Sequence, residues 1–170
     1  YSGNGWHSPF LHRDESILPG YYGVLLHRYN IHAELTATRH CGMMRFTFPK
    51  DEQSRIQVDL ARRIGGTSSE QDVRVVNDSA IEGWVRCGPE GGGMGNGVPK
   101  DLKYKLFFRA EFSRPLTSCG IWEVNFPEGV KRDLTYIKGT EYAEYCRNAT
   151  VHPGMREAHG EHLGFYTEFP

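Results

Sequence analysis

The protein is a chain of 170 residues whose charges almost balance, and this composition excludes several classes of protein. Lys and Arg number 20 and Asp and Glu number 21, so the net charge is -1. That balance argues against nucleic acid or an anionic membrane surface as a partner. No apolar run approaches the roughly 18 residues of a membrane span. The length suits one domain with a proper hydrophobic core.

The chain begins at Tyr1 instead of Met and shows no signal peptide. We therefore expect a fragment or a processed product of a longer protein. The four cysteines, Cys41, Cys87, Cys119 and Cys146, are widely spaced and form no CxxC pair. This spacing argues against a zinc knuckle or a thioredoxin-type site, and it leaves two disulfides or four reduced thiols as open alternatives.

The opening segment 1–19 is predicted to be a loop, because Gly and Pro residues interrupt any periodicity. It carries an unusual density of polar and aromatic side chains, among them His12 and Glu15. From residue 20 onwards, alternating patterns predict a series of short strands. These strands are expected over 21–26, 31–38, 43–48, 55–60, 73–75, 81–85, 104–113, 120–126, 134–138 and 163–169.

The strand expected over 31–38 has the clearest pattern in the chain. Its apolar residues occupy every second position, and the positions between them hold His32, Glu34, Thr36 and Thr38. A strand with this period buries one face and presents a polar row on the other. The open question is whether this polar row binds a ligand or only faces water.

Two further segments make specific structural predictions. The sequence Asn77-Asp78-Ser79 has a turn composition, so the strands on either side are expected to form a hairpin. The glycine-rich run at 89–99 lacks a GKS, GKT or GxGxxG motif and a following helix pattern, so we expect a surface loop and not a phosphate site.

The polar tract 141–161 is expected to hold at most a short helix near 141–147. Closely spaced strands and the lack of a long amphipathic helix together predict an all-β fold, an antiparallel sandwich.

Histidines and carboxylates offer only weak evidence for a site. His152, His159 and His162 share one polar tract, but their irregular spacing makes surface histidines the favoured interpretation over a metal site. Carboxylates such as Glu82 and Glu111 alternate with apolar residues, so they are expected on the solvated face of a sheet. Aromatic residues such as Trp84 are suited to stack on sugar rings, but they are also ordinary occupants of a sandwich.

Several sequence blocks, in order and spacing, resemble the amino-terminal domain of glycoside hydrolase family 92, the calcium-dependent exo-acting alpha-mannosidases. The most specific blocks are His12-Arg13-Asp14-Glu15 through Pro19-Gly20-Tyr21-Tyr22, followed by Glu34-Leu35-Thr36-Ala37-Thr38 and Arg45-Phe46-Thr47-Phe48-Pro49. Later blocks include Ile81-Glu82-Gly83 and the segment from Leu106 to Pro115.

The resemblance implies that residues 1–170 are the amino-terminal β-sandwich domain, of the galactose-mutarotase-like supersandwich type. In the family this domain packs on a carboxy-terminal helical toroid, which carries the catalytic groups and the calcium ligands. We therefore expect no catalytic residue, metal ligand or cofactor in this chain. The family's pocket lies between the two domains, so His12, Glu15, Glu34 and Thr36 are the expected substrate-binding residues, with buried hydrogen bonding as the alternative role.

Two positions depart from the family pattern. His40 stands where the family usually has arginine, and Met44 stands where it usually has histidine. Linkage preference therefore cannot be transferred from the family to this chain. If Arg39 replaces the missing arginine through a one-residue shift on a strand, it points to the opposite face.

The expected function is that of the non-catalytic sandwich in a secreted or periplasmic (cell envelope) alpha-mannosidase, which hydrolyses mannose-containing glycans with inversion. The expected partners are the glycan and the carboxy-terminal helical domain, with no nucleic acid and no membrane. The alternative is a free-standing carbohydrate-binding or structural sandwich without hydrolase activity.

Overall fold

A computed structural model describes residues 7–50, 54–63, 66–88, 103–126, 128 and 144–169 of the chain. The chain divides between Ser54 and Arg55 into two compact units. The strands predicted over 134–138 and the glycine-rich segment 89–99 lie wholly or largely outside the described residues.

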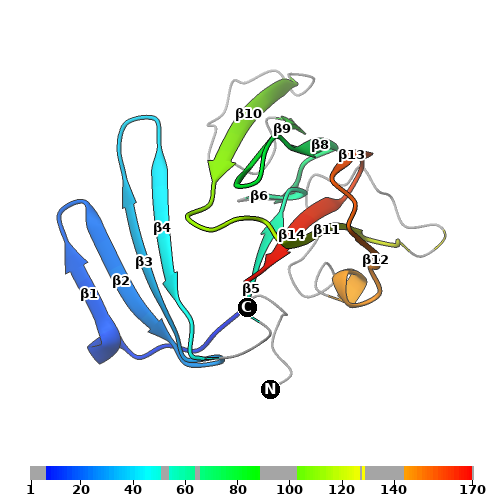
Figure 1. Ribbon diagram of the computed structural model, residues 1–170. Coiled ribbons are helices and arrows are strands. Elements are labelled where there is room, and N and C mark those ends of the chain that lie inside the picture. Colours follow the sequence, from blue (N-terminus) through cyan, green and yellow to red (C-terminus); the bar gives the residue numbers. More distant parts are fainter. Residues whose placement is uncertain are drawn as a thin grey trace. The chain divides into compact units, whose positions relative to one another are not determined.

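The first unit is a four-stranded antiparallel sheet in which each strand pairs with the next along the chain (Figure 1). It begins with a 3-10 turn, η1 (His12–Asp14), and continues through β1 (Glu15–Leu18), β2 (Tyr21–Leu26), β3 (Ile31–Ala37) and β4 (Gly42–Thr47). The predicted strands at 21–26, 31–38 and 43–48 are therefore confirmed, with boundaries within one residue.

Strand β1 corrects the prediction that the whole segment up to Pro19 is a loop. Pro19 and Gly20 form the tight turn of the β1–β2 hairpin, and Gly20 takes a φ of 75°, where a residue with a Cβ is strained. The strand has only four residues, and its adjacent apolar residues Ile17 and Leu18 are both exposed. A strand so short cannot display the alternation on which the prediction depended.

The second unit contains two four-stranded antiparallel sheets and a small ribbon. One sheet has the order β10-β9-β8-β13, the other has the order β12-β11-β14-β5, and β6 pairs with β7. The bounds are β5 (Arg55–Asp59), β6 (Arg62–Arg63), β7 (Gly66–Thr67), β8 (Glu70–Val75), β9 (Ala80–Cys87), β10 (Tyr104–Glu111), β11 (Ser118–Glu123), β12 (Thr150–Pro153), β13 (Glu157–Gly160) and β14 (Leu163–Glu168). A four-residue helical turn spans 144–147, within the segment predicted to hold a short helix.

The two larger sheets of this unit pack face to face through one apolar core, which confirms the predicted antiparallel sandwich. Val73 and Ile81 come from one sheet, and Ile121 and Phe165 come from the other; all four side chains are almost fully buried. Strand β10 contributes Phe108 to the same core from its predicted apolar face. The alternating strands thus bury their inner faces together, which is the main stabilising contribution to a sandwich.

The β8–β9 hairpin forms as its turn composition predicts. Its register pairs Val75 with Ile81, and the side-chain oxygen of Asn77 accepts a hydrogen bond of 2.9 Å from the backbone N–H of Ser79. Asn and Ser stabilise a turn by this kind of local side-chain bond.

Strands β12 and β13 lie in the tract that the sequence predicted to be non-strand. Both are edge strands of four residues, and β12 even contains Pro153. An edge strand tolerates a proline and polar side chains, because only one of its sides needs to pair. The sequences of β12 and β13 therefore lack the alternation of apolar residues from which a strand is predicted.

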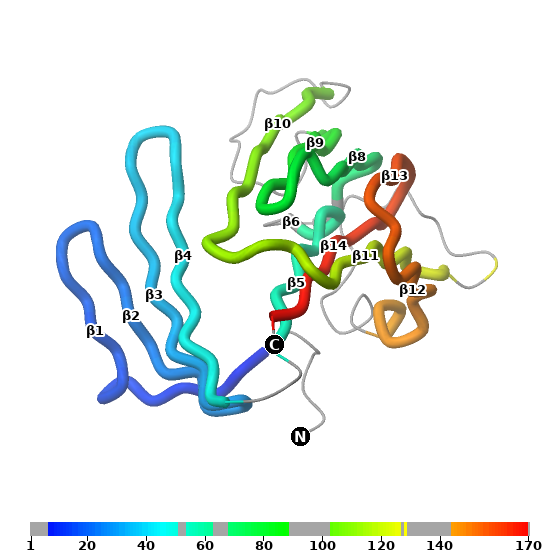
Figure 2. Tube along the Cα trace, in the orientation of Figure 1, coloured from blue at the N-terminus to red at the C-terminus, as the bar shows by residue number. Residues whose placement is uncertain are grey.

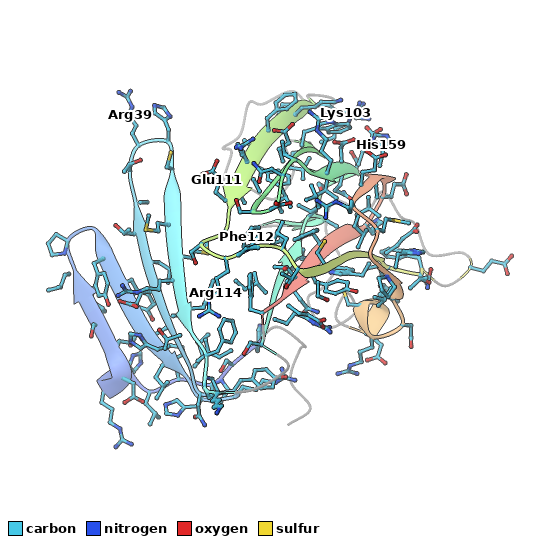
Figure 3. The ribbon with its side chains drawn as sticks, in the orientation of Figure 1. Arg39, Lys103, Glu111, Phe112, Arg114 and His159 are labelled. Atoms are coloured by element: carbon cyan, nitrogen blue, oxygen red, sulfur yellow. The ribbon has the colours of Figure 1, made fainter. Side chains whose placement is uncertain are left out.

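His162 corrects the expectation of three surface histidines. Its side chain is buried, and its ring centroid lies 4.3 Å from that of Phe126. The residue takes a left-handed φ of 56° just before β14, and its carbonyl accepts a hydrogen bond from the backbone N–H of Val124. His159, in contrast, is exposed on β13 (Figure 3).

All four cysteines are free thiols, with Cys41 exposed and Cys87 and Cys119 buried. This outcome favours the reduced alternative over two disulfides. No helix in the described part of the chain is long and apolar enough to cross a membrane.

We predict that truncation of Phe165 strongly destabilises the sandwich. Phe165→Ala removes a fully buried ring from the core between the two sheets, and the loss should lower the free energy of unfolding by about 3–5 kcal/mol. Phe107→Ala is the matched control, because this phenylalanine is 71% exposed on β10, and its change should stay within about 0.5 kcal/mol. Urea unfolding of both variants checks this, and equal losses would contradict the assignment of the core.

Candidate functional site

Two of the predicted site residues, His12 and Glu15, form a direct pair at the start of the first sheet. Nδ1 of His12 lies 2.5 Å from Oε2 of Glu15, while the hydroxyl of Tyr22 donates a 2.6 Å hydrogen bond to the other carboxylate oxygen. Glu15 and Tyr22 are on one face of the sheet, since β1 and β2 pair Ile17 with Tyr22. The bond from Tyr22, and then that from His12, lowers the pKa of Glu15.

The exposure of this pair is asymmetric. The side chain of His12 is 93% exposed, whereas that of Glu15 is only 13% exposed. Phe10 meets the His12 ring edge-on at 5.7 Å between centroids. A fixed carboxylate thus orients an exposed imidazole and leaves its second ring nitrogen on the solvent side of the pair, available for a ligand.

A second histidine pair anchors the 3-10 turn that carries His12. Asp14 lies in η1, and its Oδ2 is 2.7 Å from Nε2 of His27, in the turn between β2 and β3. The backbone N–H of Asp14 donates to the carbonyl of Leu11, and that of His27 donates to the carbonyl of Pro9. These bonds fix the segment before β1 against the sheet although it contains no regular strand.

Glu34 lies at the centre of a cluster on the opposite face of the same sheet. Its carboxylate accepts bonds from Nε of Arg45 at 2.5 Å and from the hydroxyl of Tyr21 at 3.0 Å, together with a bond from Nη2 of Arg45. Arg45 is its direct cross-strand partner on β4. The bonds from Arg45 are the main cause that lowers the pKa of Glu34 to about 2.

Gly23 makes room for this cluster. A Cβ at Gly23 would lie 2.8 Å from the hydroxyl oxygen of Tyr21, so the Tyr21 side chain lies directly across this position. Gly23 is also the cross-strand partner of Glu34. The absence of a side chain at Gly23 therefore allows Tyr21 to reach the carboxylate.

Thr36 shares the Glu34 face, and its hydroxyl donates a 2.6 Å hydrogen bond to the carbonyl of Gly20. The bond joins β3 to the β1–β2 turn. The hydroxyl of Thr36 thereby holds the same turn whose left-handed glycine the fold requires.

The structure therefore brings the four predicted site residues together in two pairs and not in one cluster. Glu15 and Tyr22 lie on one face of the first sheet, and His12 reaches Glu15 from the turn before β1. Glu34 and Thr36 lie on the other face. The sequence prediction missed the partners Tyr22 and Arg45. Tyr22 meets Glu15 through the β1–β2 register, and Arg45 meets Glu34 through the β3–β4 register, so the short hairpin turns at the ends of these strands carried the signal.

The two positions that depart from the family pattern occupy different places. His40 and Arg39 lie beyond the end of β3, and Figure 3 shows Arg39 at the tip of the turn before β4. The argument that Arg39 points to the opposite face of a strand therefore does not apply. Met44 lies on β4 opposite Leu35 and is 63% exposed.

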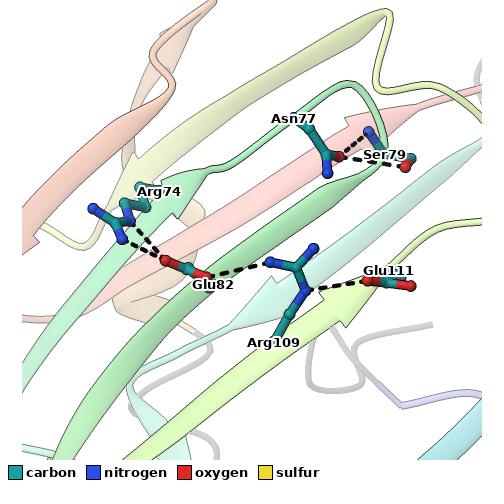
Figure 4. Close-up of polar contacts among 6 residues, drawn as sticks. All are labelled: Arg74, Asn77, Ser79, Glu82, Arg109 and Glu111. Atoms are coloured by element: carbon teal, nitrogen blue, oxygen red, sulfur yellow. Dashed lines mark hydrogen bonds and ion pairs between the residues drawn. The ribbon is translucent and has the colours of Figure 1, made fainter.

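The outer face of the β10-β9-β8-β13 sheet carries a denser set of charges. Glu82 on β9 accepts from Arg74 on β8 and from Arg109 on β10, and Arg109 also bonds Glu111 at 3.1 Å (Figure 4). Each charge in this row has an opposite charge beside it. The row thus neutralises itself, as expected for the solvated face of a sheet.

Trp84 lies on the same outer face but does not offer a free ring. Nζ of Lys105 lies 3.3 Å from the centroid of the indole, and the ring of His159 lies 5.4 Å away. His159 in turn lies 3.0 Å from Glu70 and 3.5 Å from Asp72. The Trp84 ring is packed by cationic and polar neighbours, which supports the structural interpretation of this aromatic.

Within the described ranges, no group of three or more His, Cys, Asp or Glu side chains is placed to hold a metal ion.

Comparisons with known proteins identify the family. The model of the glycosyl hydrolase family 92 N-terminal domain matches residues 2–170. No curated protein matches the chain.

Among solved structures, the chain is similar to the family GH92 alpha-mannosidase BT3965 from Bacteroides thetaiotaomicron, with 25% identity and a TM-score of 0.66 over 95% of this chain. The same mannosidase in complex with mannoimidazole gives 25% identity and a TM-score of 0.67 over 97% of this chain. In both comparisons the chain spans 18% of the mannosidase chain. The chain therefore belongs to the N-terminal domain family of the glycosyl hydrolase family 92 proteins.

Proposed function

We propose that this chain is the non-catalytic amino-terminal sandwich of an alpha-mannosidase that hydrolyses mannose-containing glycans. The observation that carries the proposal is the family match over residues 2–170. It is supported by 25% identity to an alpha-mannosidase of which the chain spans 18%. The greater part of such an enzyme thus lies outside this domain.

Because the chain spans only 18% of the mannosidase chain, the catalytic groups of such an enzyme can lie outside this domain. The family resemblance implies a carboxy-terminal helical domain with the catalytic groups and calcium, and we assign both to that domain. A glycan substrate and the family resemblance together suggest a secreted or periplasmic location for the enzyme.

We assign His12 the role of a substrate contact. Its imidazole is exposed, and Glu15 holds it by a hydrogen bond while Tyr22 holds Glu15. An oriented ring N–H or lone pair is a suitable partner for a sugar hydroxyl, because little side-chain entropy remains to be lost on binding. Glu15 acts as a positioning residue, since its side chain is only 13% exposed and its two oxygens bond to His12 and Tyr22.

Glu34 and Thr36 suit a different role. The side chain of Glu34 is only 12% exposed, and its carboxylate already accepts three hydrogen bonds from Arg45 and Tyr21. Thr36 is bonded to the β1–β2 turn. We therefore assign this pair to the packing of the sheet that supports the substrate pocket, and not to direct contact with sugar.

We predict that the isolated 170-residue chain has no turnover of an aryl alpha-mannoside above background. The reason is that the catalytic groups are assigned to the helical domain. The full-length enzyme, which contains this sandwich and its helical domain, should hydrolyse the same substrate under the same conditions. Turnover by the purified chain alone, or none by the full-length enzyme, would refute the proposed function.

In the full-length enzyme, we predict that His12→Ala raises KM about threefold to tenfold and changes kcat less than twofold. This is the size expected for one lost hydrogen bond that is equal in ground and transition states. Steady-state kinetics checks it, with Arg13→Ala as the control, because Arg13 is exposed in the same 3-10 turn. An unchanged KM for His12→Ala would remove His12 from the pocket.

We predict that Glu34 contributes to the acid sensitivity of the fold. Its pKa lies near 2, below the ordinary value of 4.5, so the stabilisation is complete above pH 4.5 and is lost as the pH falls towards 2. Glu34→Gln should therefore flatten the fall in melting temperature over this pH range. Glu111→Gln is the control, since its carboxylate is 70% exposed. Equal pH dependence in wild type and Glu34→Gln would contradict the prediction.

A further inference from the structure

A solvent-open pocket of about 560 Å³ lies in the second unit, over the β12-β11-β14-β5 sheet. Its polar lining includes Arg55 from β5, Ser118 from β11, Glu168 from β14 and Arg156 from the segment between β12 and β13. Pro153 on β12 adds an apolar wall. The volume lies within the range of roughly 300–1,000 Å³ that is typical of small-molecule sites.

The paired strands fix two of these polar groups. Arg55 and Glu168 are cross-strand partners of β5 and β14, and Nε of Arg55 donates to Oε1 of Glu168 at 3.1 Å together with its Nη2. The hydroxyl of Ser118 donates to Oε2 at 2.8 Å. These bonds lower the pKa of Glu168, so the carboxylate is charged at neutral pH.

This arrangement leaves unused hydrogen-bonding capacity beside the pocket. A carboxylate has about four acceptor sites and a guanidinium has five N–H donors. Glu168 uses three acceptor sites and Arg55 uses two donors in the bonds above. Because the side chains of Arg55 and Glu168 are still 44% and 34% exposed, an acceptor and several donors remain accessible side by side, which is the pattern that neighbouring hydroxyl groups of a ligand can satisfy.

Arg156 adds a donor that the protein does not use. Its side chain is exposed and has no hydrogen-bond or ion-pair partner among the described residues, although its backbone carbonyl accepts from Val75. A long cationic side chain at the rim of a pocket can donate to a ligand without first breaking a bond within the protein. Binding therefore breaks no bond within the protein at this residue, and its cost is the ordering of the arginine side chain.

The charge balance decides between two classes of ligand. Two arginines would suit a phosphate, but the carboxylate of Glu168 is in direct contact with Arg55 and would repel a phosphate. The exposed side chains of Val151 and Pro153 supply apolar surface instead, whereas the Tyr166 ring is buried, with the Arg55 guanidinium 4.9 Å above its centroid. Glu168 neutralises Arg55, and Arg156 is left as the one unneutralised charge that the described residues place in the lining. A sugar hydroxyl can both donate to Glu168 and accept from an arginine, whereas phosphate offers mainly acceptor oxygens, so this lining favours a neutral sugar with hydroxyl groups and C–H patches.

We propose that this pocket is a glycan-binding subsite of the sandwich that takes a neutral hexose unit, with Arg156 and Glu168 as its hydroxyl partners. The identity of that hexose as mannose rests on the proposed function, whereas its class as a neutral sugar rests on the pocket alone. The pocket consists of residues from Arg55 onwards, and none of them belongs to the His12 or Glu34 pairs.

The test is binding of methyl alpha-mannoside to the 170-residue chain, followed by NMR or calorimetry. We expect weak but saturable binding that Arg156→Ala reduces about tenfold, the effect expected for loss of a charged hydrogen bond. Arg114→Ala is the matched control: this arginine is exposed after β10, outside the pocket lining (Figure 3). It should bind as the wild type does.

Three further measurements make the result decisive. Glu168→Gln should also weaken binding, and its melting temperature must be compared with that of wild type because the residue pairs two strands. Inorganic phosphate should fail to compete. Equal affinity of wild type and Arg156→Ala, or displacement by phosphate, would overturn the proposal.

Binding measurements with methyl glucoside, galactoside and mannoside test this proposal separately from the proposed function. If methyl glucoside or galactoside binds in an Arg156-dependent manner and the mannoside does not, the neutral-sugar subsite stands and its assignment to mannose fails. If no hexoside binds the chain at millimolar concentration, the subsite is refuted, while the mannosidase assignment still depends on turnover by the full-length enzyme.

Discussion

The pairing register of β2 with β3 is the constraint on which the first unit depends. It places Tyr22 opposite Leu35 and Gly23 opposite Glu34, so that adjacent tyrosines project to opposite faces of one sheet. Tyr21 therefore bonds Glu34, and Tyr22 bonds Glu15. A shift by one residue between β2 and β3 would move Glu34 to the other face and break its bond with Tyr21, since side chains alternate along a strand. The same shift between β1 and β2 would break the bond of Tyr22 with Glu15. The register thus decides which carboxylate orients an exposed histidine and which one holds the sheet together.

A comparable constraint acts in the second unit. Strand β14 lies between β11 and β5, as Figure 2 shows, and it joins the last described segment of the chain to the first strand of the unit. Its inner face contributes Phe165 to the core, and its outer face contributes Glu168 to the pocket. Because the two residues are three positions apart, the alternation of one strand serves both packing and hydrogen bonding. Stability and the surface for a ligand come from the same pairing.

Much of this arrangement could be predicted from the sequence, and the failures have physical causes. Long strands keep their alternation in the sequence, as β9 does with its buried Ile81 and Gly83 and as β3 does although Ala33 is its one buried residue. The edge strands β12 and β13 do not, because an edge needs fewer apolar residues and tolerates Pro153. The burial of His162 depends on a left-handed turn and contact with Phe126, which lies far from it in sequence. The sequence named candidate site residues one by one, but which of them lie together follows only from the strand register.

The Arg55–Glu168 pair shows why a structural contact and a binding contact need not exclude each other. The pair joins two strands, and on an exposed surface such a bond contributes little to stability because water competes for both partners. Its main effect is on geometry, since two directed bonds from Arg55 and one from Ser118 hold the carboxylate in a single orientation. A fixed carboxylate loses little entropy when it accepts a further bond from a ligand. The same reasoning applies to Glu15 beside His12, so in both units an internal hydrogen bond orients the group that remains available.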